Sequence, residues 1–189
     1  MNPKQYIIFD LEATCWDKTT QSNQIHEIIE IGAVKLNGTA DKIDTFQTFV
    51  KPSKNPVLSD FCTDLTSIRQ SDVDSAAYFS EAIHNFEKWI GSDSADCMLV
   101  SWGYYDKKQL IAECAIKNYH GVILNYLNNH HSLKHDFAKM REIKPCGMEK
   151  ALEILNIPLD GTHHRGIDDA LNIAKIFKQA YHEWKGMDK

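Results

Sequence analysis

The first fifty residues carry short apolar runs that are typical of β-strands. Tyr6 opens the run YIIFDLE, residues 25–36 form a longer apolar segment, and apolar side chains alternate with polar ones over residues 43–50. Period-two alternation and short continuous apolar runs both indicate strands. Gly38 lies in the turn between the second and third segments. Because these connections are short, the pattern predicts an antiparallel meander at the start of a sheet.

Helical spacing dominates the rest of the chain. Apolar residues recur every three or four positions over residues 79–90, 110–115, 148–155 and 167–184. Between the first two of these segments, CMLVSW at residues 97–102 forms a short continuous apolar run, as in a strand that is covered on both faces. We therefore expect an α/β fold with a mixed five-stranded sheet, an antiparallel meander plus parallel strands, flanked by helices.

The composition is that of a globular protein. The 189 residues are 43% apolar and 25% charged, and no repeat, low-complexity tract or long linker divides them. We expect residues 1–189 to form a single domain. A chain of this length buries roughly 70% of the surface that its unfolded state exposes, so it needs no metal or disulfide in order to fold. Any metal inferred from the sequence is therefore functional.

Three features of the sequence bear on the cellular location and on the partners: the cysteines, the net charge and the N-terminal region. The longest early apolar run, residues 6–9, is shorter than a signal-peptide core of about 7 to 15 residues. Five cysteines without a CxxC pair are typical of reduced structural thiols. The sequence therefore predicts a cytoplasmic protein without a membrane partner. The net charge of -5 argues against a protein that coats long duplex nucleic acid, but it is compatible with binding a short end.

Asp10 and Glu12 are the first candidate functional residues. They lie two positions apart at the end of an apolar strand, so their side chains point to the same face. Two partly buried carboxylates that face one way repel each other, and they either raise a pKa or hold a cation. The alternative is an exposed acidic strand end without a function.

Two further acidic positions lie next to predicted elements. Asp106 follows the strand of residues 97–102, at the strand end where ligands of α/β sheets bind, although a plain helix N-cap also explains it. In THHRGIDDALNIA, His164 precedes Asp169 by five residues at the start of the last helix. Asp168 and Asp169 both suit the first turn because of the helix dipole, and the spacing alone does not separate them.

The combination of these residues suggests a metal centre. Asp10, Glu12, Asp106 and Asp169 carry a charge of about -4, which two Mg²⁺ ions would cancel, and hard cations prefer oxygen ligands. Two such ions stabilise the attacking and leaving oxygens when a phosphodiester is displaced in line. His164 would be the general base that accepts a proton from the attacking water, unless it is an exposed loop histidine.

Other metal and phosphate motifs receive less support. A zinc site at His130, His131 and His135 lacks a nearby cysteine or acid to complete four ligands. The segment HEIIE at His26 lacks the second histidine of the HExxH zinc-protease motif. The chain also contains neither GxxxxGK[ST] nor GxSxG, which argues against a P-loop ATPase and a nucleophile-elbow esterase.

Three segments, FDLEATC, SWGYYDKKQL and HHRGIDDALNIA, resemble the three motifs of the DEDDh, or DnaQ-like, 3′-to-5′ exonuclease superfamily. The likeness spans nearly the whole chain. Together with HEIIEIG and LSDFCTDLTSI, these segments look closest to the Eri-type exoribonucleases and the bacterial KapD-like proteins. All five signature residues match in order and spacing.

The resemblance implies a ribonuclease-H-like fold, two Mg²⁺ or Mn²⁺ ions, and release of nucleoside 5′-monophosphates from 3′ ends. The H-x-x-x-x-D spacing of the family selects His164 over His163 as the base, and Asp169 over Asp168 as a ligand. The metal ligands would be Asp10, Glu12, Asp106 and Asp169. The substrate would be bound by Ala13, Thr14, Phe61, Leu65, Thr66 and Tyr105.

Within the substrate site, the resemblance gives residues different roles. Ala13 and Thr14 would line the nucleotide site, and Phe61 would stack on the terminal base unless it belongs to the core. Leu65 and Thr66 would flank the sugar. The second motif departs from the family because Gly103, Tyr104 and Tyr105 intervene before Asp106, so either Trp102 or Tyr105 would contact the second base.

The expected partner is a single-stranded 3′ end, with RNA favoured over DNA. DNA remains an alternative because recognition of the 2′-hydroxyl is a matter of local geometry. A catalytically silent nucleic-acid-binding scaffold is a second alternative, although silent relatives should lack a ligand. A metallophosphatase for small phosphate esters is a third, but it leaves Phe61 and the DEDDh spacing unexplained.

Overall fold

A computed structural model describes residues 3–17, 19, 24–91 and 94–187, with side chains described as far as residue 183. Its strands are β1 (Gln5–Ala13), β2 (Ile28–Asn37), β3 (Lys42–Lys51), β4 (Ala77–Tyr78), β5 (Cys97–Ser101) and β6 (His130–Ser132). Its helices are α1 (Asp60–Thr66), α2 (Gln70–Asp74), α3 (Phe79–Ile90), α4 (Tyr105–Ile116), α5 (Ile123–Leu127), α6 (Leu133–Met140), α7 (Met148–Ile154) and α8 (Gly166–Met187).

The strands form one mixed sheet in the order β4-β3-β2-β1-β5-β6. Strand β2 pairs antiparallel with β1 and β3, whereas β5 pairs parallel with β1 and β6. The predicted α/β class and mixed sheet are confirmed, but the expected number of five strands is wrong. The described residues form six strands, and β4 and β6 have only two and three residues. Strands this short show no periodic pattern in the sequence.

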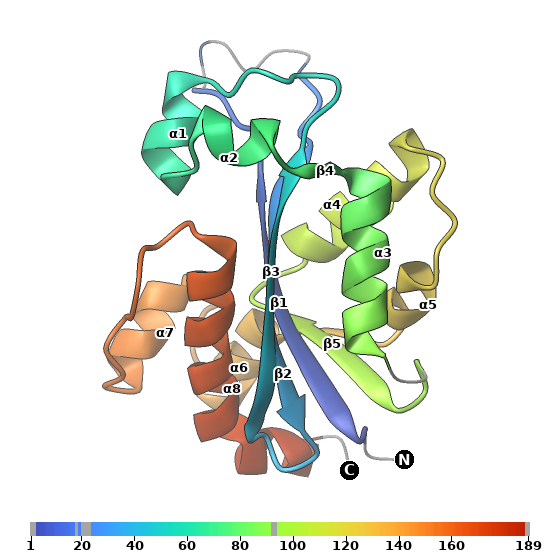
Figure 1. Cartoon of the computed structure of the whole chain (residues 1–189). Helices are drawn as coiled ribbons and strands as arrows, with labels where there is room; N and C mark the ends of the chain where they lie inside the picture. The colour runs from blue at the N-terminus through green and yellow to red at the C-terminus, as the bar shows by residue number, and fades with distance from the viewer. Residues whose placement is uncertain (1–2, 18, 20–23, 92–93, 188–189) are drawn as a thin grey trace.

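Helices cover both faces of the sheet (Figure 1). On β1, Tyr6 and Ile8 pack into a core with α6, α7 and α8, while Ile7, Phe9 and Leu11 pack into a second core with α3, α4 and α5. Successive strand residues point to opposite faces, so a strand between two helical layers must be apolar at every position. This explains the continuous apolar run that precedes Asp10.

Helices α1 and α2 pack over one end of the sheet, above the point where β1 ends (Figure 1). A third, small core lies beneath them and consists of Ile29, Leu58, Cys62, Ile68 and Val73. The hydroxyl of the N-cap residue Ser59 accepts a hydrogen bond from the Cys62 amide at 3.0 Å and donates to the Cys15 carbonyl at 2.6 Å. This hydroxyl therefore attaches α1 to the segment that follows β1.

The structure also bears on the predicted helix bounds, the cysteines and the membrane-spanning potential. Helices α3 and α7 occupy the predicted segments, and α8 starts at Gly166, one residue before the predicted start near Ile167. All five cysteines are free thiols, and three of them are buried. Within the described ranges, none of the helices is both long enough and apolar enough to cross a membrane.

Gly32 on β2 allows the start of α8 to approach the sheet closely. A Cβ atom at Gly32 would lie 2.1 Å from the backbone carbon of Gly166 and from the backbone nitrogen of Ile167. No flexible side chain stands between these backbones to relieve such a clash. The first turn of α8 is thereby held against the central strands, at the level of Asp10, whose carbonyl oxygen would lie 3.2 Å from a Cβ at Gly166.

We expect Gly32→Ala to destabilise the protein by about 3 kcal/mol or more, the upper end of what overpacking costs, because two backbones must separate. Urea unfolding measures the effect. Gly38→Ala is the matched control, since the nearest atom to its Cβ is a carbonyl oxygen at 3.4 Å, and its stability should change by less than about 1 kcal/mol. Equal stabilities of the two variants would contradict the close approach.

Candidate active site

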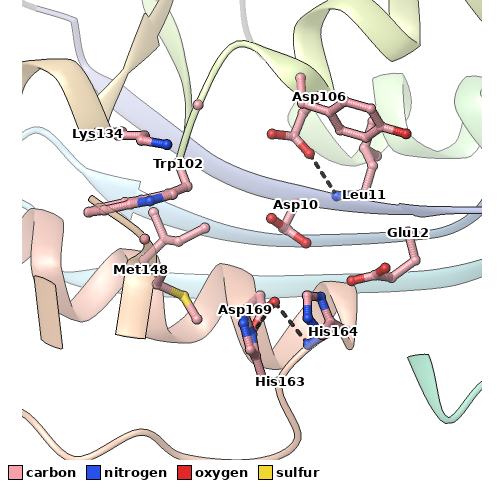
Figure 2. Close-up of a pocket in the computed structure, with 14 residues that line it drawn as sticks. Asp10, Leu11, Glu12, Trp102, Asp106, Lys134, Met148, His163, His164 and Asp169 are labelled. Carbon is pink, nitrogen blue, oxygen red and sulfur yellow. Dashed lines mark hydrogen bonds and ion pairs between the residues drawn. The ribbon is translucent and has the colours of Figure 1, made fainter. Parts of the chain in front are cut away.

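A cavity of about 400 Å³ opens where the ends of β1 and β5 meet the start of α8. Side chains from β1, α4, α6, α7 and α8 and from the loops beside them converge on it (Figure 2). Its lining consists of Asp10, Leu11, Glu12, Trp102, Gly103, Tyr105, Asp106, Lys134, Gly147, Met148, His163, His164, Asp169 and Ile173. All five residues predicted to be catalytic are in this set.

Asp10 and Glu12 point from β1 toward Asp169 on α8 (Figure 2). One carboxylate oxygen from each of the three residues lies within 4.8 Å of the others. Glu12 and Asp169 are buried, with 8% and 5% of their surfaces exposed. This arrangement is not the exposed acidic strand end that the sequence left open.

Asp106 reaches the cavity from the opposite side, in the first turn of α4. The N-cap of this helix is Tyr104, so the explanation of Asp106 as an N-cap is wrong. Its Oδ1 atom instead accepts a hydrogen bond from the Leu11 backbone at 3.2 Å, which connects α4 to β1 between the two acidic residues. Asp106 is 5% exposed, and it lies outside the close group that Asp10, Glu12 and Asp169 form.

The structure separates Asp168 from Asp169. The Asp169 carboxylate lies in the cavity and accepts a hydrogen bond from the backbone nitrogen of His164 at 3.1 Å. The Asp168 carboxylate points away from it and accepts a hydrogen bond from the backbone nitrogen of Thr162 at 2.8 Å. Asp168 therefore stabilises the loop before α8.

Two histidines, His163 and His164, line the cavity beside Asp169. Their rings are stacked with centroids 3.9 Å apart. His163 Nδ1 lies 3.0 and 3.1 Å from the two oxygens of Asp169. Burial, followed by the charge of His163, lowers the pKa of His164, which favours the neutral imidazole. The sequence analysis had singled out only His164, and the adjacent pair HH was the available signal for His163.

The surroundings of the cavity strongly disfavour the charged forms of its carboxyl groups. Burial is the main cause for each: it raises the pKa of Asp10, with added repulsion from Asp106 and Glu12, and it raises the pKa of Asp106 to about 6. Burial and the charge of Asp169 raise the pKa of Glu12 to about 8. Among the described residues, no lysine or arginine forms an ion pair with any of these groups.

These features fit divalent cations. Buried carboxylates that lack a lysine or arginine partner lose free energy unless they are protonated or hold a metal. The closest three offer only oxygen ligands, which hard cations such as Mg²⁺ and Mn²⁺ prefer. Asp10, Glu12 and Asp169, with Asp106 opposite, are therefore suited to hold such ions.

The predicted substrate residues have different surroundings. Tyr105 lines the cavity and is 54% exposed, and Phe61 and Leu65 are exposed on α1 at 42% and 37%. Phe61 is thus not a core residue. It lines a neighbouring cavity together with Trp16 and Leu58.

Thr14 and Thr66 are buried, and their hydroxyl groups are used within the fold. The Thr14 hydroxyl accepts a hydrogen bond from the Glu27 backbone at 2.9 Å. The Thr66 hydroxyl donates to the Cys62 carbonyl at 2.8 Å, and Thr66 has no exposed surface to offer a sugar. Ala13 is 7% exposed at the end of β1.

Two buried glutamates of the HEIIE segment have structural roles that the sequence did not predict. Glu30 accepts hydrogen bonds from the Gly166 backbone at 3.0 Å and from Arg165 at 3.1 Å, and it thereby fixes the start of α8. Glu27 accepts from the backbone of residues 53–55 and pairs with Lys117. Their only signal was an acidic residue inside a strand that is otherwise apolar.

The alternative zinc site at His130, His131 and His135 does not form. Within the described part of the chain, these residues are absent from the groups whose ligand atoms lie close enough to share an ion. His130 Nε2 bonds to the Ser101 hydroxyl at 2.9 Å, and His135 Nδ1 bonds to the Ser132 hydroxyl at 2.7 Å. Local hydrogen bonds therefore hold one nitrogen of His130 and one of His135.

The sequence model of the exonuclease family RNase_T matches residues 7–177. The chain belongs to this family. Its relatives include the 3′-5′ exonuclease Snipper of Drosophila melanogaster, 31% identical over 93% of this chain and 69% of Snipper. ERI1 exoribonuclease 2 of Xenopus laevis is 33% identical over 90% of this chain. The chain spans only 27% of that relative's length.

Solved exonuclease structures share the fold of this family member. The nuclease domain of 3′hExo, a DEDDh family member bound to rAMP, superposes with a TM-score of 0.85 and 29% identity, over 96% of this chain and 93% of that domain. The expected ribonuclease-H-like fold and the likeness to Eri-type exoribonucleases are thus confirmed. A DEDDh exonuclease fold implies dependence on divalent metal, in agreement with the carboxylates of the cavity.

We expect Asp10→Asn to stabilise the metal-free protein, because it removes one negative charge from a cluster of carboxylates that repel one another. The raised pKa values mean that this repulsion is absent at pH 5 and grows as the pH rises through about 6 to 8. At pH 8.5 in EDTA, the variant should gain roughly 1 to 3 kcal/mol, or about 2 to 4 °C in Tm per kcal/mol.

Thermal unfolding at pH 5 and pH 8.5, with EDTA or Mn²⁺, measures this effect. In the unsubstituted protein, Mn²⁺ should raise Tm more at pH 8.5 than at pH 5, and Asp10→Asn should lose most of that gain. A variant that is less stable than the unsubstituted protein at pH 8.5 in EDTA would show that the carboxylates do not repel each other.

Proposed function

We propose that this chain is a metal-dependent 3′-to-5′ exonuclease that hydrolyses phosphodiesters at the 3′ end of single-stranded RNA or short oligonucleotides. The observation that carries the proposal is the set of carboxylates Asp10, Glu12, Asp106 and Asp169, of which Asp10 is half-buried and the other three are buried, unpaired by lysine or arginine and adjacent to His164. Residues 1–189 would act as a single domain in the cytoplasm. Nucleoside 5′-monophosphates would be the products.

The five residues predicted to be catalytic would each have a role in this reaction. Asp10, Glu12, Asp106 and Asp169 would hold two Mg²⁺ or Mn²⁺ ions. When bound, these ions supply electrostatic stabilisation of the attacking and leaving oxygens of the phosphodiester. The His164 imidazole would accept the proton of the attacking water as general base. The backbone N–H of His164 donates a hydrogen bond to the Asp169 carboxylate, which keeps the base next to the carboxylates.

The surroundings of the cavity suit the end of a single strand. Phe61 presents an exposed aromatic face at the nearby end of the sheet, and stacking on a base contributes roughly 1 to 3 kcal/mol without regard to sequence. Trp102 and Tyr105 both line the cavity and are the candidates for the second base. The relatives named as exoribonucleases support RNA as the preferred substrate.

A digestion time course tests the proposal. Single-stranded RNA and DNA oligonucleotides of the same sequence, labelled at the 5′ end, are incubated with Mg²⁺, Mn²⁺ or EDTA. We expect a ladder that shortens from the 3′ end only when metal is present, and faster on RNA. Asp169→Asn keeps the size of the side chain but removes a ligand, so it should abolish cleavage.

Each remaining alternative has a distinct result in this assay. Equal rates on RNA and DNA would overturn the RNA preference alone. Bound oligonucleotide without cleavage, in protein that binds Mn²⁺, would favour a silent scaffold. Release of phosphate from small esters but not of nucleotides from oligonucleotides would favour a phosphatase.

We expect His164→Ala to lower kcat by about 10² to 10⁴, as the loss of a general base does, while Mn²⁺ binding persists. Single-turnover digestion and calorimetric titration with Mn²⁺ measure the two quantities separately. His163→Ala is the neighbouring comparison. A normal rate for His164→Ala together with a large loss for His163→Ala would transfer the role of base to His163.

A further inference from the structure

The residues that precede and open α8 contain a second group of metal-ligating atoms. Ring nitrogens of His163 and His164 and a carboxylate oxygen of Asp169 all lie within 4.8 Å of one another. His163 Nδ1 is 3.0 Å from the nearer Asp169 oxygen. This group shares Asp169 with the acidic cluster but offers two nitrogens in place of the oxygens of Asp10 and Glu12 (Figure 2).

The ligand types of this group favour a borderline cation over Mg²⁺. Two imidazoles and one carboxylate form a ligand set that binds zinc in enzymes, with water in the fourth position. Metal–ligand distances of about 2.0 to 2.2 Å place tetrahedral ligand atoms roughly 3.3 Å apart. The observed separation of His163 Nδ1 and Asp169 is close to that value. Imidazole also prefers Zn²⁺ to Mg²⁺, which retains oxygen ligands.

A second carboxylate lies near His163. Glu149 on α7 places Oε2 at 3.9 Å from His163 Nε2, on the side of the ring that faces away from Asp169. Ligating histidines usually direct the second ring nitrogen to a carboxylate, which fixes the tautomer and makes the ligating nitrogen more basic. Each ring nitrogen of His163 therefore has a carboxylate near it: Asp169 lies 3.0 Å from Nδ1, and Glu149 lies 3.9 Å from Nε2, close enough to become the second partner of a metal-bound ring.

We propose that His163, His164 and Asp169 bind one Zn²⁺ ion, and that this ion inhibits the enzyme. Zinc at this position would occupy His164 and Asp169, so neither would be available for the reaction with Mg²⁺ or Mn²⁺. The inhibition rests on the proposed function, whereas the binding does not. His163 is the residue that creates the site, because His164 and Asp169 alone supply only two ligands.

Competition for Zn²⁺ with a chromophoric chelator, in the presence of Mg²⁺, tests the binding directly. We expect one tight site per chain. His163→Asn should weaken it by at least about 100-fold because it removes a ligand, and Glu149→Gln should weaken it by about 10-fold because it removes only a group near a ligand. His120→Asn is the matched control, since His120 is exposed in the segment between α4 and α5 and should leave Zn²⁺ affinity unchanged.

Two further measurements identify the ligands of the Zn²⁺ ion and its effect on cleavage. Co²⁺ in place of Zn²⁺ should give visible absorption bands that weaken in His163→Asn. Zn²⁺ should inhibit oligonucleotide cleavage in the unsubstituted protein, and inhibition of His163→Asn, relative to its own zinc-free rate, should need at least about 100-fold more Zn²⁺. Because Glu149 is largely exposed, Glu149→Gln tests the site even if His163→Asn folds poorly.

Equal Zn²⁺ affinity in the unsubstituted protein, His163→Asn and Glu149→Gln would overturn the site. So would loss of Zn²⁺ binding in Asp10→Asn but not in His163→Asn, since the ion would then lie among the acidic residues. Tight, His163-dependent Zn²⁺ binding in a protein that cleaves no oligonucleotide would support the site and reject the proposed function instead.

Discussion

Repulsion among buried carboxylates is the constraint on which the rest of this structure depends. Asp10, Glu12 and Asp169 lie close together with little water around them, and burial raises the pKa of each. Such a group is unfavourable for folding unless cations offset it. The fold supplies the opposing free energy from two large apolar cores on either side of β1. The carboxylate cluster thus makes the protein less stable than its two cores alone would make it, as is usual where a site is built for a ligand.

The framework around the carboxylates keeps them from moving apart. Glu30 bonds to the backbone of Gly166 and to Arg165, and the missing side chain of Gly32 lets α8 approach the sheet. On the other side, the bond from the Leu11 backbone to Asp106 connects α4 to β1. These contacts join β2 to α8 and β1 to α4. The positions of the acidic side chains therefore follow from the packing of α4 and α8 on the central strands.

Local patterns in the sequence predicted the longer strands and helices, but not short elements such as β4 and β6. They also predicted the pairing of Asp10 with Glu12, because strand periodicity alone places them on one face. The spacing of the family motif was needed to choose Asp169 over Asp168, a choice that the structure explains by the bond from Thr162 to Asp168. The roles of Glu27, Glu30 and His163 were not predictable, since each depends on partners far along the chain or on a side-chain direction. Burial of Thr66 likewise depends on how α1 packs, which no local pattern encodes.

Anomalous diffraction from crystals grown with Mn²⁺ and a nucleoside 5′-monophosphate tests the central claim most directly, because it locates the ions themselves. We expect two Mn²⁺ peaks about 3.5 to 4 Å apart in the cavity, ligated by Asp10, Glu12, Asp106 and Asp169, with the phosphate beside them. Peaks elsewhere on the protein, or a cavity without Mn²⁺ at saturating concentration, would contradict the claim that these carboxylates form a metal centre.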